Sequence, residues 1–194
     1  MSRIIAGRAG GHRLGTPGHS RTRPTSDLVR EAAFNLIAAW AGTVGEPADS
    51  MLGGFSFLDL YGGTGAVALE AASRGAAPVV CVERDRPTAA LARANAQATG
   101  LSVDVVASSV DDYLAGRPRP FDVVWFDPPY ELPNAVLEAQ VAVLVKGWLA
   151  PDCLVVLERS SRDTAPTWPD VLIDRRARRY GETTLYLAGR EEAA

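Results

Sequence analysis

The segment from Phe121 to Tyr130, FDVVWFDPPY, joins a strand of the buried type to side chains that could do chemistry. Its continuous apolar run is typical of a parallel strand that is covered on both faces. The run stops at the carboxylate of Asp127, and Pro128 and Pro129 stiffen the turn because their φ angles are fixed. Ligands of open α/β sheets bind outside the carboxyl ends of the strands. The four residues of this DPPY turn are therefore the candidate catalytic residues.

The DPPY turn fits the transfer of a group to an amine on an aromatic base, whose lone pair is delocalised into the ring. If the Asp127 carboxylate and the Pro128 carbonyl accept the two amine protons, the nitrogen becomes more tetrahedral and its lone pair can be aimed at an electrophile. The prolines hold both acceptors in place, so no rearrangement is needed during the reaction. The ring of Tyr130 could stack on the base.

A glycine turn and two acids upstream predict an adenosine-type cofactor. Gly63 and Gly65 separate a strand from its helix, where glycine lets the backbone approach a ligand. Glu83 ends the next strand and could accept hydrogen bonds from both hydroxyls of a ribose. The glycines also satisfy a dinucleotide pattern, but the Asp59 carboxylate would repel a pyrophosphate and attract the ammonium of a methionine moiety. S-adenosylmethionine is therefore favoured, with Ser108 and Ser109 near the adenine edge.

Strands and helices alternate from Phe55 onward, which predicts a doubly wound, mostly parallel sheet. The pattern predicts strands at 55–61, 79–83, 103–107, 121–127 and 153–158, and helices at 66–74, 87–98, 110–115 and 134–146. The tail, residues 171–189, reads as two strands joined by a turn at Tyr180 and Gly181. A closing antiparallel hairpin is therefore expected.

Three units are expected along the chain. Residues 1–24 form a basic β-hairpin extension around a Gly10-Gly11 turn, which we expect to bind RNA. Deletion of residues 1–20 should abolish RNA methylation and leave cofactor binding intact. Residues 25–54 hold a helix from about Asp27 to Ala41, with Arg30 off its apolar stripe, and a linker of turn formers. Residues 55–190 form the cofactor-binding domain.

Charge is distributed unevenly along the 194 residues, whose formal net charge is -3. The first 26 residues hold five arginines and no acid, which predicts a local anionic partner, with nucleic acid first in line. No apolar run approaches the roughly 20 residues that a membrane helix needs, so we expect a cytoplasmic protein. The only cysteines, Cys81 and Cys153, lie in apolar runs and are expected to be buried core thiols. His12 and His19 are too isolated for a metal site.

The motifs together resemble a known family. DPPY with DLYGGTG is similar to the class I amino-methyltransferases, and the whole chain resembles the RsmD-type enzymes, which methylate N2 of a guanine in 16S ribosomal RNA. The segments that carry the resemblance are RIIAGRAGGHRL, RPTSDLVREAAFNLI, FLDLYGGTGAVALEAASRGA, VERD and DPPY. Gly62 departs from the family, which more often has alanine there, and Tyr130 is often phenylalanine.

The resemblance implies a fold, a cofactor and a site. The fold is a Rossmann-like class I methyltransferase, with a seven-stranded, mostly parallel sheet, an antiparallel last strand and a small N-terminal β-hairpin extension. The implied cofactor contacts are Asp59, Tyr61, Gly63, Gly65, Glu83, Arg84, Ser109 and Asp127. The RNA-binding residues are expected to be Arg3, Arg8, Arg13, Arg21, Arg23 and Arg30.

Other functions use parts of the same pattern. A DNA adenine or cytosine methyltransferase could use DPPY but needs a target-recognition region, and only about 54 residues lie outside the core. A protein glutamine methyltransferase commonly has Asn in place of Asp127. An NAD-dependent oxidoreductase or a non-catalytic RNA-binding module would not need the DPPY turn. We expect a monomer that acts on 16S ribosomal RNA, within the small subunit or a late assembly intermediate.

Overall fold

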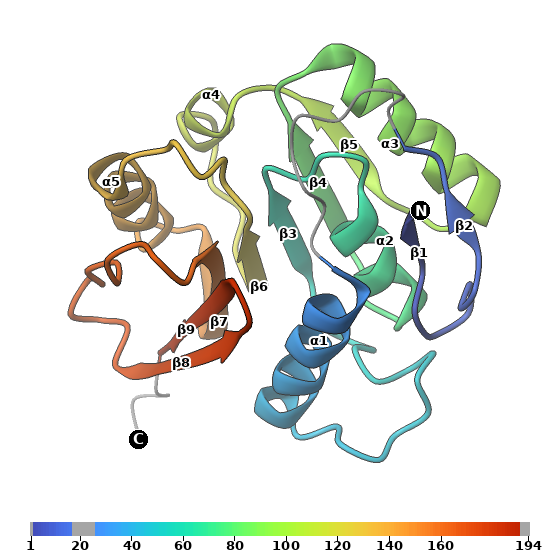
Figure 1. Cartoon of the computed structure of the whole chain (residues 1–194), viewed down its shortest axis with the longest axis horizontal. Helices are drawn as coiled ribbons and strands as arrows, with labels where there is room; N and C mark the ends of the chain where they lie inside the picture. Colours follow the sequence, from blue (N-terminus) through green and yellow to red (C-terminus); the bar gives the residue numbers. More distant parts are fainter. Residues whose placement is uncertain (1, 17–25, 191–194) are drawn as a thin grey trace.

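The computed structural model describes residues 2–16 and 26–190, and it is built around a seven-stranded sheet of order β5-β4-β3-β6-β7-β9-β8 (Figure 1). The strands are β3 Phe57–Leu60, β4 Val79–Glu83, β5 Asp104–Ala107, β6 Phe121–Phe126, β7 Leu149–Ser160, β8 Asp174–Tyr180 and β9 Thr183–Gly189. The pairs among β3 to β7 are parallel, whereas β9 runs antiparallel to β7 and to β8. The predicted doubly wound sheet with a reversed last strand is confirmed.

Helices cover both faces of the sheet. Nearly every position of the central strands is apolar, so both faces must be shielded from water. The helices are α1 Asp27–Ala41, α2 Ala66–Ser73, α3 Arg86–Thr99, α4 Val110–Leu114 and α5 Asn134–Leu144. One core cluster joins α1, α2 and α3 to one face of the sheet, and a second joins α4 and α5 to the other (Figure 1). Both cysteines lie in these cores as free thiols, as predicted. Within the described residues, no helix is long and apolar enough to cross a membrane.

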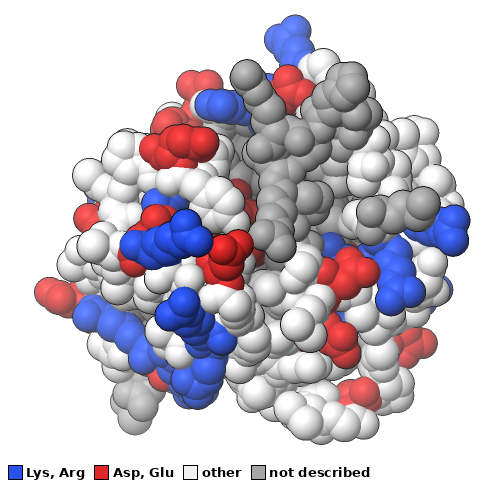
Figure 2. Space-filling model, in the orientation of Figure 1, with Lys and Arg blue, Asp and Glu red and all other residues white. Residues whose placement is uncertain are grey.

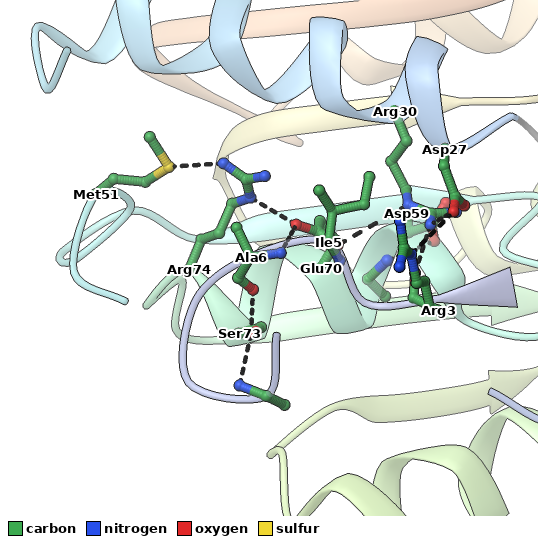
Figure 3. A network of polar contacts seen from close by, with 12 residues as sticks. Arg3, Ile5, Ala6, Asp27, Arg30, Met51, Asp59, Glu70, Ser73 and Arg74 are labelled. Atoms are coloured by element: carbon green, nitrogen blue, oxygen red, sulfur yellow. Dashed lines mark hydrogen bonds and ion pairs between the residues drawn. The ribbon is translucent and has the colours of Figure 1, made fainter. Parts of the chain in front are cut away.

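The N-terminal hairpin pairs β1 Ser2–Arg3 with β2 Arg13–Leu14, and it is built into the core. Ile4 and Leu14 are buried with the α1 to α3 cluster. The fully buried carboxylate of Glu70 accepts hydrogen bonds from the backbone N–H groups of Ile5 and Ala6, at 2.6 and 3.0 Å (Figure 3). The same carboxylate pairs with Arg74 at 2.7 Å. Removal of the hairpin would strip these donors from a buried charge, so we expect the deletion to destabilise the fold. Whether cofactor binding survives the deletion stays a prediction.

Helix α1 begins and ends where the sequence predicts, but its buried face differs. Ser26 caps its first turn by accepting from the N–H of Val29. The sequence pattern places Arg30 outside the apolar stripe, whereas Arg30 is fully buried, as are Phe34 and Ala38 of the same helix. Helical periodicity is read from apolar residues, so it could not show that the arginine at position 30 is buried.

The expected linker between α1 and β3 is partly anchored. Met51 and Leu52 are buried, and the N–H of Leu52 donates to the carbonyl of Arg74. The Sδ atom of Met51 lies 3.0 Å from a guanidinium nitrogen of Arg74. This segment therefore packs against the C-terminal end of α2 and contributes to the core.

Candidate active site at the carboxyl edge of the sheet

Three carboxylates from neighbouring strands face the same side of the sheet at its carboxyl edge. Asp59 on β3 pairs with Cys81 on β4 and with Trp125 on β6. Glu83 and Asp127 each lie two residues beyond these partners, so their side chains point to the same face as that of Asp59. The backbone N–H of Asp127 still donates to the carbonyl of Leu60, at 3.4 Å, which keeps it in line with β3. The structure therefore brings together the two predicted cofactor acids and the acid of the DPPY turn.

Asp59 is the most strongly perturbed of these acids. Its side chain is 1% exposed, and burial raises its pKa well above the ordinary value. A hydrogen bond from the N–H of Ala68, at 3.1 Å, opposes this rise, while Asp127 and Glu83 add to it by charge repulsion. No ion pair neutralises Asp59 among the described residues. A buried carboxylate of this kind is suited to a cationic ligand.

Glu83 holds the glycine turn in shape. One of its oxygens accepts from the N–H of Gly63 at 2.9 Å, and the other accepts from the N–H of Asp85 at 2.7 Å. Gly63 and Gly65 both have positive φ angles, 54° and 81°, which L side chains rarely adopt. Each carboxylate oxygen retains a further lone pair, so Glu83 can also accept the hydroxyls of a ribose.

Gly62 is required by close packing and not by its φ angle. A Cβ added at Gly62 would lie 2.3 Å from the Sγ atom of Cys81 and 3.2 Å from an oxygen of Asp59. The sulfur of Cys81 therefore fills the space that the methyl group of an alanine at position 62 would need.

Tyr61 occupies a strained backbone position, with φ 65°, and is the only non-glycine residue of positive φ in the described chain. Its hydroxyl donates to Gln140 of α5 at 2.8 Å, and the Gln140 amide donates to Asp111 of α4 at 2.8 Å. This chain ties the turn after β3 to two helices. Tyr61 therefore lies at the predicted cofactor turn, where its backbone is fixed by these contacts.

Arg159 of β7 anchors the DPPY turn. Its side chain is 3% exposed, and its guanidinium donates to the carbonyls of Pro129 at 3.3 Å and Leu132 at 3.0 Å. It also pairs with Asp163 at 3.0 Å. Pro128 is buried, whereas Tyr130 is 49% exposed and can offer its ring to a ligand. The turn is thus held from β7 while its aromatic end remains accessible.

The remaining predicted cofactor residues lie at the same edge of the sheet. Ser109 follows β5 and caps α4 by accepting from the N–H of Asp112 at 3.1 Å, and its hydroxyl also donates to the Asp112 carboxylate. Arg84 is exposed directly after Glu83. Since the Ser109 hydroxyl is already engaged, a contact from its backbone is the simpler expectation for a ligand.

The predicted RNA-binding arginines divide into three groups. Arg3, Arg8 and Arg13 of the hairpin are exposed. Arg21 and Arg23 lie outside the described residues. Arg30 is fully buried and donates to the carbonyl of Arg3 and to Asp27 at 2.9 Å. The prediction that Arg30 contacts RNA is therefore wrong, because its guanidinium stabilises the junction of the hairpin and α1 (Figure 3).

Two positioning residues, Arg159 and Gln140, were absent from the predicted site. Arg159 follows the apolar run 153–157 at the carboxyl end of β7, and Gln140 lies among the apolar residues of α5. A polar side chain at such a position is the signal that could have identified each residue. In the described part of the chain, no group of three His, Cys, Asp or Glu side chains is arranged to hold a metal ion.

Comparison with known proteins places the chain in a family. The family described as Conserved hypothetical protein 95 matches residues 2–189. The ribosomal RNA small subunit methyltransferase D of Escherichia coli is 33% identical over 169 residues, which cover 86% of this chain and 79% of that protein. The chain belongs to the methyltransferase D family. The resemblance found from the motifs is thereby confirmed.

Solved structures agree with this assignment to the methyltransferase D family. The yhhF structure of Escherichia coli is 31% identical, with a TM-score of 0.82 and 98% of each chain covered. The Thermus thermophilus 16S rRNA N2 G1207 methyltransferase RsmC, solved in complex with AdoMet and guanosine, is 22% identical. It has a TM-score of 0.65 and covers 88% of this chain and 45% of its own. The likeness to RsmC shows a shared fold.

Proposed function

We propose that this protein transfers a methyl group from S-adenosylmethionine to the exocyclic N2 amine of a guanine in 16S ribosomal RNA. The observation that carries the proposal is the convergence of Asp59, Glu83 and Asp127 on one face of the carboxyl edge, with Asp127 inside the anchored DPPY turn. The proposal is supported by membership of a family whose relatives are named as ribosomal RNA methyltransferases.

The residues at this edge fit the charges of S-adenosylmethionine. The buried Asp59 carboxylate, which has no ion-pair partner among the described residues, would hold the methionine ammonium. Glu83 would accept the ribose hydroxyls, and the positive φ angles of Gly63 and Gly65 let the backbone come close to the ligand. When bound, the cofactor supplies a methyl group that is activated by its sulfonium.

The DPPY turn would prepare the guanine amine. Asp127 and the Pro128 carbonyl would accept hydrogen bonds from its two N–H groups, and the stacking of Tyr130 would fix the plane of the base. Transfer of the methyl group from sulfur to N2 would leave a positive charge on that nitrogen. Asp127 or water would then accept one of its protons. Because Arg159 holds the carbonyls of Pro129 and Leu132, the acceptors are in place before the reaction.

The substrate would be held by positive charge at the N-terminal hairpin. The exposed Arg3, Arg8 and Arg13, together with Arg21 and Arg23, would contact RNA phosphates. The target would be presented within the small ribosomal subunit or a late assembly intermediate, in the cytoplasm, to a monomeric enzyme. A single copy suffices, since all three acids belong to one chain.

Substitution of Asp127 tests this function at the site. In Asp127→Ala, methyl transfer to 16S ribosomal RNA should fall by at least about a hundredfold, or roughly 2.7 kcal/mol, because the acceptor acts in the transition state. Cofactor affinity, measured by calorimetry, should change by less than about threefold. The exposed Asp152→Ala variant, at the opposite end of the sheet, serves as the control. Turnover of Asp127→Ala within about threefold of the unmodified protein would contradict the proposed role.

A further inference from the structure

Strand β8 has an unusually basic composition for an edge strand. Its sequence, DRRARRY, places Arg175, Arg176, Arg178 and Arg179 within five positions, and every residue from 174 to 179 is exposed. In Figure 2, Lys and Arg side chains gather over the region that β8 occupies in Figure 1. The surrounding protein is acidic overall, with a net charge of -3. This concentration of positive charge therefore differs from the rest of the molecule.

Most of this charge is not neutralised within the described residues. Arg176 pairs with Asp174 at 2.8 Å, and no other arginine of β8 has a carboxylate partner in that part of the chain. Arg178 donates to the carbonyl of Ala177, and Arg179 donates to the carbonyl of Gly181. Bonds to nearby backbone carbonyls leave the full charge of Arg178 and Arg179 available to an anion.

The sheet register places Arg178 in line with the catalytic acid. Arg178 pairs with Leu185, and Leu185 pairs with Glu158 of β7. The residue before Glu158, Leu157, pairs with Phe126, so Glu158 is level with Asp127. Side chains in such a cross-strand row point to the same face of a sheet. Arg178 and Asp127 therefore lie on one face and at one edge, three strands or roughly 14 Å apart.

Arg179 lies in the next cross-strand row, and its side chain is on the opposite face of the sheet from that of Arg178. It pairs with Thr184, and Thr184 pairs with Arg159, whose guanidinium contacts the carbonyls of Pro129 and Leu132. The carboxyl end of β8 thus has one arginine on each face of the sheet, and both lie at the sheet edge that carries the reaction centre.

We propose that Arg178 and Arg179 at the carboxyl end of β8 form a second RNA-binding surface, which holds phosphates of the strand that flanks the target guanine. This inference rests on the proposed function and assigns its substrate a second contact, distinct from the N-terminal hairpin. The hairpin packs on α2, beside β3 and β4, whereas β8 is the outer strand beyond β7 and β9. RNA bound to both surfaces would cross the DPPY turn between them.

The test is the double variant Arg178→Gln/Arg179→Gln, which removes two charges without breaking an ion pair or an anchor of the described chain. The matched control is Arg117→Gln/Lys146→Gln, which removes two exposed charges near the amino ends of β6 and β7. Filter binding of radiolabelled 16S ribosomal RNA gives the affinity at several salt concentrations. Calorimetry with S-adenosylmethionine and the melting temperature report on cofactor binding and folding.

The β8 variant should bind RNA at least fivefold more weakly than the control variant, with unchanged cofactor affinity and melting temperature. The slope of log affinity against log salt should fall by about 1.4, since each phosphate contact on a single strand contributes about 0.7. Equal affinities and slopes for the two variants would overturn the inference. So would aggregation of the β8 variant with unchanged RNA affinity, because the arginines would then serve only to protect a sheet edge. RNA binding without methyl transfer by the unmodified protein would instead contradict the proposed function.

Discussion

At the scale of single residues, the buried carboxylate of Asp59 lowers the stability of the fold and provides a binding site for a cationic ligand. Burial raises the pKa of Asp59, so the folded protein holds a proton at pH values where the unfolded chain has released it. The free energy of unfolding should therefore fall as the pH rises from about 3.9, the pKa of an aspartate in the unfolded chain, through the raised pKa of Asp59 in the folded protein. A cationic ligand beside the carboxylate stabilises its charged form and so offsets this loss of stability. Cofactor affinity should accordingly increase with pH over the same window.

Asp59→Asn tests this trade. The variant keeps an oxygen that can accept from the N–H of Ala68 but carries no buried charge, so it should unfold at a higher urea concentration at neutral pH and lose the pH dependence described above. Its affinity for S-adenosylmethionine should fall at least about tenfold, or roughly 1.4 kcal/mol. Asp104→Asn, on the exposed side of β5, is the control. Lower stability together with unchanged affinity would disprove this interpretation.

Gly62 gives a second prediction, based on packing. Gly62→Ala should destabilise the fold by about 1–3 kcal/mol, because its methyl group would overlap the Cys81 sulfur. Removing that sulfur should make room, so Gly62→Ala/Cys81→Ala should be more stable than Gly62→Ala alone. Urea unfolding of both single variants and the double variant measures the coupling. Strictly additive effects would show that the two positions do not compete for the same space.

At the scale of structural elements, the DPPY turn depends on β7 through Arg159. Arg159→Met should lower kcat at least about tenfold at temperatures where the variant is folded, because the Pro129 and Leu132 carbonyls lose their donor. Cofactor affinity should remain unchanged, and Arg159→Lys should recover part of the loss. The control is Arg162→Met, an exposed neighbour that pairs with Glu182. If Arg159→Met lowered only the melting temperature, the residue would have a purely structural role.

The N-terminal hairpin depends on α2 through Glu70. Glu70→Gln should cost about 3 kcal/mol of stability, because one amide replaces a carboxylate that accepts two backbone N–H groups and pairs with Arg74. Thermal denaturation measures the loss, with the exposed Glu31→Gln as control. Equal melting temperatures for the two variants would mean that the hairpin is held by its apolar contacts alone.

At the scale of the whole molecule, the sequence predicted what depends on local patterns. The alternation of strands and helices, the bounds of α1 and the glycine turn before Ala66 follow from period, caps and φ preferences, and all are observed. The convergence of Asp59, Glu83 and Asp127 was predictable as well, since the carboxyl ends of parallel strands share an edge.

The remainder depends on contacts between distant segments. The burial of Arg30 could not be predicted, because its partners include the carbonyl of Arg3 and the nearby carboxylate of Glu70. Glu70 in turn bonds the N–H of Ile5, 65 residues away. Arg159 similarly acts on carbonyls 27 and 30 residues upstream. No period or propensity within one segment encodes such pairs, and only the packed sheet reveals them.

In the proposed reaction, the N2 amine of a guanine receives the methyl group. The most direct measurement is the transfer of radiolabelled methyl from S-adenosylmethionine to small ribosomal subunits from cells that lack this enzyme, followed by mass spectrometry of the nucleosides. With the unmodified protein, the label should appear in N2-methylguanosine, and Asp127→Ala should give at least about a hundredfold less. Label in another nucleoside or in ribosomal protein, or no label despite cofactor binding, would contradict it.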